Sequence, residues 1–212
     1  MHLHITNSLK KWCQTWLPTL ALLVFLTACS SVQDDVPATT WQQHQTQLQN
    51  LTQYQASGKI AYRDLHKRQG LNFSLNQSPQ LTRFKLFTFI GQTVLTVEIT
   101  PQGTLIVDQN GEEYRSSNAS ELVEQLAGIS IPVAELSDWI KGLPTGADSQ
   151  QLNAGQRIAQ FTKQIDHQDW KLTYQSYQQV LESSIPALGM PKNLVLRQGQ
   201  TELKIAITHW SY

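Results

Sequence analysis

Residues 56–63 read Ala-Ser-Gly-Lys-Ile-Ala-Tyr-Arg, and in this stretch apolar or small side chains alternate with polar ones. Ala56, Gly58, Ile60 and Tyr62 fall on one side of an extended chain. Because successive side chains of a β-strand point to opposite faces, this period of two predicts a strand with one apolar face. The same alternation recurs along most of the chain and predicts a mainly β fold.

Further strands are predicted on the C-terminal side of a polar loop at residues 64–70. An Asn-Gly pair at residues 110–111 is a strong hairpin signal between two of them. About ten strands indicate an antiparallel sheet that is too wide to stay flat and therefore curls. The predicted strands cover residues 71–75, 81–87, 93–100, 103–107, 112–115, 157–165, 168–177, 192–197 and 202–210.

Three segments instead repeat their apolar residues at helical spacing. The first, from Trp41, follows Thr40, which with Gln43 has the pattern of a capping box, and we expect its apolar stripe to serve core packing rather than ligand contact. The second runs from Asn118 to a stop at Gly128, and the third from 132 to 142. These two interrupt the strands and are expected to cap the concave side of the sheet. Their candidate lid residues are Leu122, Leu126, Val133, Leu136, Trp139 and Ile140.

The loop at residues 87–92, between two predicted strands, contains Phe89, Ile90 and Gly91. A hairpin tip is usually polar, so two large apolar residues there require an explanation. Either the loop folds back on the core, or its tip contacts an apolar partner.

The N-terminal 28 residues resemble a secretory signal. Lys10 and Lys11 precede an apolar run at 17–25, which is too short to span a bilayer, although a membrane anchor is the alternative. The run ends in Leu26-Thr27-Ala28-Cys29, which resembles the bacterial lipoprotein processing signal. That resemblance implies that residues 1–28 are removed and that Cys29 carries acyl chains.

After the proposed lipid site, residues 29–40 have the composition of a flexible tether, and 41–212 are expected to form one domain. The resemblance to Gram-negative lipoproteins implies transport to the outer membrane, because Ser30 rather than aspartate follows Cys29. The second cysteine, Cys13, lies in the signal, so no thiol remains for a disulfide or a metal.

Charge and motifs exclude several function classes. The chain has 16 basic and 16 acidic side chains, and loss of the two signal lysines leaves a small acidic excess, which argues against a nucleic-acid partner. The sequence contains no G-x-S-x-G, H-E-x-x-H or phosphate-binding glycine loop, so we expect no enzyme, cofactor or metal site. A secreted curved sheet covered by helices is suited to holding something apolar in its concavity. The rival class is a structural or assembly lipoprotein that binds a protein partner through a sheet edge.

Several stretches together resemble the LolB family of outer-membrane lipoprotein receptors. The resemblance spans residues 41–212, and its most specific motif is Trp-Ile-x-Gly-Leu-Pro at 139–144. It also includes Gly-Lys-Ile-Ala-Tyr at 58–62, Phe-Ile-Gly-Gln-Thr at 89–93 and Gly-Glu-Glu-Tyr at 111–114. Phe89-Ile90-Gly91 stands where the family commonly has Pro-Leu-Gly.

The family resemblance implies both an architecture and a role. The fold would be an unclosed antiparallel barrel of about eleven strands, with short helices as a lid over an apolar cavity. The protein would be a lipid-anchored monomer that faces the periplasm, accepts lipoproteins from the carrier LolA and inserts their acyl chains into the inner leaflet of the outer membrane. Phe89, Ile90 and Gly91 would form the membrane-inserting loop.

Overall fold

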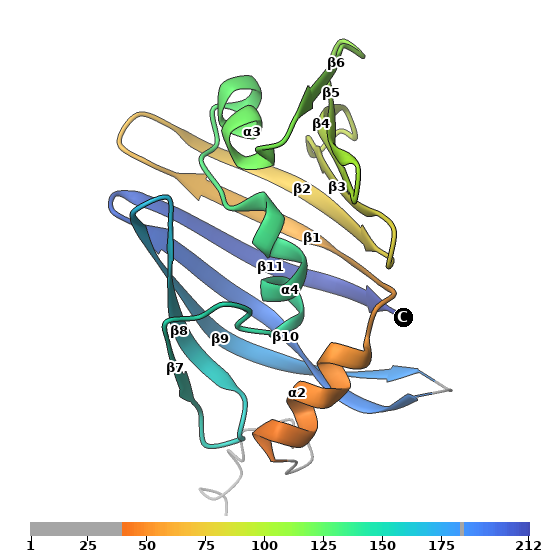
Figure 1. The fold of residues 1–212 in the computed structure, drawn as a ribbon, viewed down its shortest axis with the longest axis vertical. Helices are drawn as coiled ribbons and strands as arrows, with labels where there is room; N and C mark the ends of the chain where they lie inside the picture. The colour runs from red at the N-terminus through yellow and green to blue at the C-terminus, as the bar shows by residue number, and fades with distance from the viewer. Residues whose placement is uncertain (1–39, 183–184) are drawn as a thin grey trace, which may run out of the picture. The chain divides into compact units, whose positions relative to one another are not determined.

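The computed structural model describes residues 40–182 and 185–212, and eleven strands within them form a single antiparallel sheet (Figure 1). Its strands are ordered β6-β5-β4-β3-β2-β1-β11-β10-β9-β8-β7. The first and last strands, β1 (Tyr54–Arg63) and β11 (Thr201–Ser211), pair at the centre. The edge strands β6 (Glu113–Ser116) and β7 (Ser149–Leu152) have no partner on their outer side in this sheet, so the sheet is unclosed. The others are β2 (Arg68–Gln77), β3 (Thr82–Phe87), β4 (Thr93–Thr100), β5 (Gly103–Asp108), β8 (Ile158–Ile165), β9 (Gln168–Glu182) and β10 (Ile185–Gln198).

The number of strands, eleven, agrees with the number implied by the family resemblance. It is one more than the ten strands that the alternation pattern predicts. The missed strand is β7, whose four residues are all exposed and therefore show no apolar period. The expected loop at residues 64–70 is also shorter, because the Asp64 carboxylate accepts hydrogen bonds from the N–H groups of His66 (2.7 Å) and Lys67 (2.6 Å). This tight turn lets β2 begin at Arg68.

Helix α2 (Trp41–Asn50) precedes the sheet, while α3 (Ala119–Ala127) and α4 (Val133–Lys141) lie between the two edge strands in sequence. Figure 1 shows α3 and α4 in front of the sheet, as expected of segments that connect β6 to β7 across one face. Thr40 forms the expected capping box with Gln43, and Gly128 and Gly142 end their helices with φ angles of 61° and 97°.

The core lies between this face of the sheet and the helices. Alternate strand residues such as Ile60, Phe73 and Ile205 face inward and are at most 3% exposed. Among the described residues, the core cluster runs from Trp41 to Trp210.

Gly58 allows two central strands to approach closely. It follows a register shift between β1 and β11, and a Cβ atom at this position would lie 2.0 Å from the carbonyl oxygen of Ala206. Only glycine fits so close to a neighbouring backbone.

Candidate functional site

Helix α4 supplies one wall of the space on the concave side of the sheet. Its residues Val133, Leu136, Trp139 and Ile140 are all at most 2% exposed. The Trp139 ring meets Phe161 of β8 edge to face, with 5.1 Å between ring centroids. The apolar face predicted from the sequence therefore packs directly on the sheet, and side chains fill the space at this point.

Helix α3 lies nearer the other edge and packs on β4 and β5. Leu122 and Leu126, the two residues expected to belong to the lid, are partly buried against the core, whereas their neighbour Val123 is 1% exposed. The deepest contact of this helix is thus made by Val123, and the two leucines lie at its margin.

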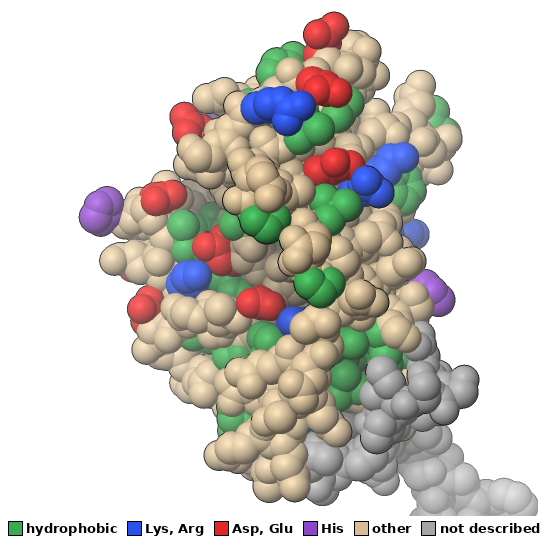
Figure 2. Space-filling view, turned by 45° about the vertical axis from the view of Figure 1, so that its right-hand side comes forward, with side chains coloured by type: hydrophobic (Ala, Val, Ile, Leu, Met, Phe, Trp, Pro, Cys, Tyr) green, Lys and Arg blue, Asp and Glu red, His purple; other side chains and the backbone are tan. Residues whose placement is uncertain are grey.

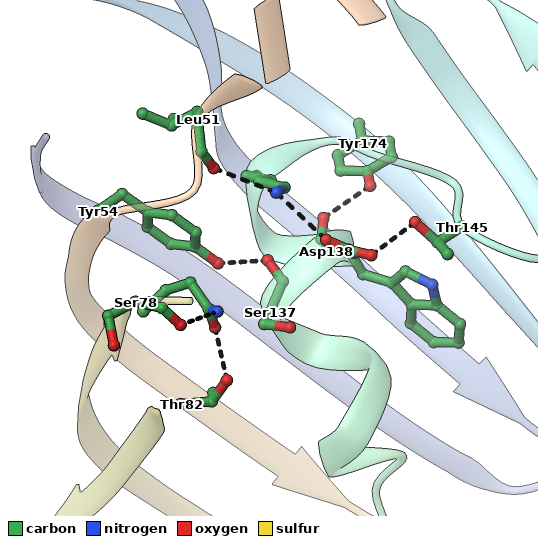
Figure 3. Close-up of polar contacts among 11 residues, drawn as sticks. Leu51, Tyr54, Ser78, Thr82, Ser137, Asp138, Thr145 and Tyr174 are labelled. Carbon is green, nitrogen blue, oxygen red and sulfur yellow. Dashed lines mark hydrogen bonds and ion pairs between the residues drawn. The ribbon is translucent and has the colours of Figure 1, made fainter. Parts of the chain in front are cut away.

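Two tyrosines from the sheet hold α4 by hydrogen bonds to its backbone (Figure 3). The Tyr54 hydroxyl of β1 donates to the carbonyl of Ser137, and the Tyr174 hydroxyl of β9 donates to the carbonyl of Trp139 at 2.7 Å. Burial is the main cause that raises the pKa of both phenols well above 10.0. Both hydroxyls are therefore neutral donors at physiological pH.

Lys141 adds a third connection, at the C-terminal end of α4; its partners Leu51 and Asp138 are labelled in Figure 3. Its side chain is 8% exposed, and its Nζ donates to the carbonyl of Leu51 at 3.3 Å and lies 3.2 Å from Asp138 Oδ1. The hydroxyl of Thr145 donates to Asp138 Oδ2 at 2.7 Å. These contacts link the end of α4 to the segment that follows α2.

Polar contacts also join the N-terminal half of the lid to its surroundings. The Val133 N–H donates to Ser120 Oγ at 3.1 Å and so connects α4 to α3. Lys163 of β8 lies 3.5 Å from the carboxylate of Glu135. These contacts join the N-terminal half of α4 to α3 and to β8.

One polar atom within the apolar wall lacks a partner. The indole N–H of Trp139 is buried and makes no hydrogen bond with the described residues. A buried donor left unpaired costs about 1–3 kcal/mol, which makes the closed packing of α4 less favourable than a fully satisfied one.

The loop between β3 and β4 is a hydrogen-bonded turn with an apolar tip. The Gly91 N–H donates to the carbonyl of Thr88 at 3.0 Å, and Gly91 has a φ of 88°. Phe89 and Ile90 occupy the two central positions and are 90% and 66% exposed. The tip therefore points into solvent, and the loop does not fold back on the core. The loop's own hydrogen bonds fix this turn, which contains no proline.

Sequence reasoning missed a second apolar tip. Leu65, in the turn between β1 and β2, is 73% exposed and lies in a stretch that the sequence indicated only as a polar loop. From the β1–β2 turn, β2 runs to the other end of the sheet, and the antiparallel β3 returns toward the β3–β4 loop. The turn and the loop therefore lie at the same end of the sheet. Leu65 could have been found from the sequence in the same way as Ile90, because it is an apolar residue in a polar turn.

Figure 2 shows acidic and basic side chains interspersed on one face, with hydrophobic side chains in small groups between them. Among the described residues, no three His, Cys, Asp or Glu side chains gather as a metal site would require. None of the described helices is both long and apolar enough to cross a membrane. The proposed lipid site Cys29 and the signal lie outside the described residues.

An apolar ligand at the position of α4 would take the place of Val133, Leu136, Trp139 and Ile140, which pack on the sheet there. The apolar surfaces that would then face the ligand are those of the core, including Trp139 and Phe161.

The comparisons with known proteins agree with this architecture. The family model described as "Outer membrane lipoprotein LolB" matches residues 52–210. The outer-membrane lipoprotein LolB of Vibrio vulnificus is 37% identical to this chain, and the match covers 92% of this chain and 96% of the Vibrio protein. The LolB protein of Pectobacterium carotovorum is 33% identical, and the match covers 97% of this chain and 98% of that protein.

Among solved structures, a DUF1329 family protein from Desulfovibrio piger is similar in fold, with a TM-score of 0.52 and 8% identity over 81% of this chain and 91% of that chain. The family match covers most of the sheet and both lid helices, and the sequence identities extend over nearly whole chains. The chain therefore belongs to the outer membrane lipoprotein LolB family.

Proposed function

We propose that this protein is an outer-membrane receptor that accepts lipoproteins from the periplasmic carrier LolA and delivers their acyl chains to the inner leaflet of the outer membrane. Membership of the LolB family and the outer-membrane names of its relatives support the location. A lipid-trafficking role needs no catalytic group.

The hydrophobic effect explains why such a receptor is needed. Hiding an acyl chain of about 15 methylenes from water is worth roughly 12 kcal/mol, at about 0.8 kcal/mol for each methylene. A lipoprotein therefore cannot cross the periplasm uncovered. In our proposal, α4 moves aside, the acyl chains replace its apolar face against the sheet, and a more favourable bilayer then receives them. Transfer along such a gradient of affinity requires no nucleotide.

The observation that carries the proposal is the exposed tip of Phe89 and Ile90 on a turn that holds its own shape. A core residue would be buried, whereas an apolar pair fixed in solvent is suited to entering a bilayer. We therefore assign Phe89, Ile90 and Gly91 to the membrane-inserting loop, and Leu122, Leu126, Val133, Leu136, Trp139 and Ile140 to the lid.

The structure does not favour the alternative of an assembly lipoprotein that pairs through a sheet edge. Both edge strands, β6 and β7, have only four residues, and every residue of β7 is exposed with no apolar face. Short polar edges offer few hydrogen bonds and little apolar area to an added strand.

The test is a two-stage transfer assay with Ile90→Glu. Purified carrier loaded with lipoprotein, the receptor and liposomes are mixed, and cargo on the receptor is scored separately from cargo in the membrane. Uptake should be unchanged because Ile90 contributes little to the core, while delivery should fail because a carboxylate opposes insertion. Ile90→Leu is the matched control. Delivery by Ile90→Glu at the wild-type rate, or failure already at uptake, would show that the loop has another role.

A second experiment tests the anchor. Replacing Cys29 by Ala should leave a precursor or an untethered protein that is removed from outer membranes by a high-salt wash, because the acyl chains would be missing. Retention of this variant in the washed membrane would exclude Cys29 as the anchor.

A further inference from the structure

The outer face of the sheet, on the side away from the helices, carries a concentration of positive charge. The four central strands β2, β1, β11 and β10 contain six Lys or Arg residues and one acidic residue, Glu202. The whole chain, in contrast, has equal numbers of basic and acidic side chains. The excess on these strands is therefore a local feature.

The register of the strands shows which side chains share this face. Lys59 lies opposite Asn72 and Ala206, and the next outward residue, Ala61, lies opposite Gly70 and Lys204. Directly opposed residues of antiparallel strands point to the same side. Because the intervening Ile60 belongs to the core, these side chains point away from the helices.

Small residues leave a hollow in the middle of this basic face. The hollow has a volume of about 450 Å³, within the range of about 300–1,000 Å³ that is typical of small-molecule sites. Ala61, Gly70 and Ala206 contribute little side-chain volume, whereas Lys59 and Lys204 supply ammonium groups. The exposed ring of Phe89 lines the same hollow.

A second hollow of about 360 Å³ adjoins the first, because both are lined by Ala61, Gly70 and Lys204. It adds the guanidinium groups of Arg63 and Arg68. Together the two hollows form a groove that begins at Phe89 and continues toward the β1–β2 turn, where Leu65 is exposed.

The single carboxylate on these four strands, Glu202, is already neutralised. Glu202 lies 3.1 Å from Arg63 and 2.7 Å from Arg197, with Lys204 at 3.5 Å. Burial opposes ionisation of Glu202, but the hydrogen bond from Arg197 and the surrounding positive charges hold its pKa below the ordinary value. Lys204 is 60% exposed, and Lys59 has no carboxylate within 4.0 Å among the described residues, so both can bind an external anion.

We propose that this groove seats the phosphate headgroup of an anionic phospholipid in the acceptor bilayer. The inference rests on the proposed function of the β3–β4 loop and extends it to a specific lipid contact. Cations beside an exposed aromatic side chain match the chemistry of a phospholipid, in which a phosphate adjoins apolar chains. Lys59 and Lys204 bind the phosphate while Phe89 and Ile90 enter the acyl region, so the groove sets how the receptor meets the membrane.

The test measures binding of the protein without residues 1–29, and without cargo, to two kinds of vesicle. One contains phosphatidylcholine alone, and the other contains phosphatidylcholine and phosphatidylglycerol in equal parts. Wild type should prefer the anionic vesicles, and Lys59→Gln should lower that binding about fivefold, the contribution expected of one basic residue near an anionic surface. The double variant Lys59→Gln/Lys204→Gln should lower it about 25-fold.

Lys171→Gln is the matched control for charge. Lys171 lies on β9, opposite Arg197, and so on the same outer face. Three strand spacings, about 14 Å, separate β9 from β1, which exceeds the Debye length of about 8 Å at physiological salt. Lys171→Gln should therefore change binding less than about twofold.

Gly70→Val tests the hollow itself. A Cβ atom at Gly70 would meet nothing within 4 Å, so valine can fill the groove without disturbing the fold. This variant should lose binding to anionic vesicles while its thermal unfolding is unchanged. Wild-type binding by Gly70→Val, or an equal loss in Lys171→Gln and Lys59→Gln, would overturn the headgroup site.

The outcome can be separated from that of the proposed function. If the groove variants bind anionic vesicles normally while Ile90→Glu still blocks delivery of cargo, the headgroup site alone is wrong. If Ile90→Glu delivers cargo at the wild-type rate, the assigned role of the loop is wrong, whatever the lysines do.

Discussion

Under the proposed function, releasing α4 from the sheet should make the protein bind acyl chains more tightly. In the closed structure the hydroxyls of Tyr54 and Tyr174 donate to carbonyls of Ser137 and Trp139, and both bonds must break when the helix moves. The double variant Tyr54→Phe/Tyr174→Phe removes these two bonds and keeps both aromatic rings. It therefore weakens the closed state with little change in the apolar packing.

The size of the effect follows from the number of bonds. A buried hydrogen bond contributes about 1 kcal/mol net, so the two together favour closure by about 2 kcal/mol. At about 1.4 kcal/mol for each factor of ten, the fraction of open molecules should rise about 30-fold while that fraction remains small. Apparent affinity is proportional to the competent fraction, so the dissociation constant for an acyl ligand should fall by a similar factor.

The assay is a titration of a fluorescent fatty acid, accompanied by hydrogen exchange of residues 133–141. Tyr177→Phe is the control, because its hydroxyl donates to the carbonyl of Ile158 at 2.7 Å, a bond between β9 and β8 that does not involve α4. The control should lose stability without gaining affinity. Unchanged affinity in the double variant, or an equal gain in Tyr177→Phe, would refute the idea that these bonds hold a lid.

Two further predictions concern stability. Burial, with a smaller effect of the Arg157 charge, lowers the pKa of His44 from 6.5 to about 3, so the unfolded state binds a proton below pH 6.5 that the folded state does not. Lowering the pH from 7.5 to 5 should therefore reduce the free energy of unfolding by about 2 kcal/mol, as measured by urea titration. Gly58→Ala should lower the same free energy by about 3 kcal/mol, because its Cβ would clash with the Ala206 carbonyl, whereas Gly70→Ala should change it by about 0.5 kcal/mol or less.

Controls make both stability predictions specific. His44→Phe should abolish this part of the pH dependence, while His66→Gln, at an exposed turn, should retain it. Retention of the full dependence in His44→Phe would assign it to other groups. For the glycines, equal stability of the two alanine variants would mean that β1 and β11 can separate at the bulge without cost.

Local features of the fold were predictable because their causes are adjacent in sequence. The cap at Thr40, the helix stops at Gly128 and Gly142 and the Asn-Gly turn each depend on a few neighbouring residues. The apolar tip at Phe89 and Ile90 was visible for the same reason. Strand β7 was not, since a polar edge strand has no buried face and hence no alternation.

Features that depend on distant pairing could not be read from the sequence. Tyr54 and Ser137 are 83 residues apart, and nothing in either neighbourhood indicates their hydrogen bond. The basic groove depends on the register that sets Ala61 opposite both Gly70 and Lys204. The burial of α4 side chains against the sheet likewise depends on how the helix packs, which the helical period alone does not determine.

Crosslinking from the lid tests the central claim most directly. A photoreactive amino acid replaces Leu136, which is 1% exposed on the inner side of α4, and in a control it replaces Leu152, which is 39% exposed on the edge strand β7. The receptor is mixed with lipoprotein-loaded carrier and illuminated before and after liposomes are added. We expect position 136 to crosslink to the acylated lipoprotein before liposomes are added, to lose the crosslink afterwards, and to give none with a lipoprotein that lacks acyl chains. Equal crosslinking from position 152, or none from position 136 during uptake, would contradict acyl-chain binding beneath α4.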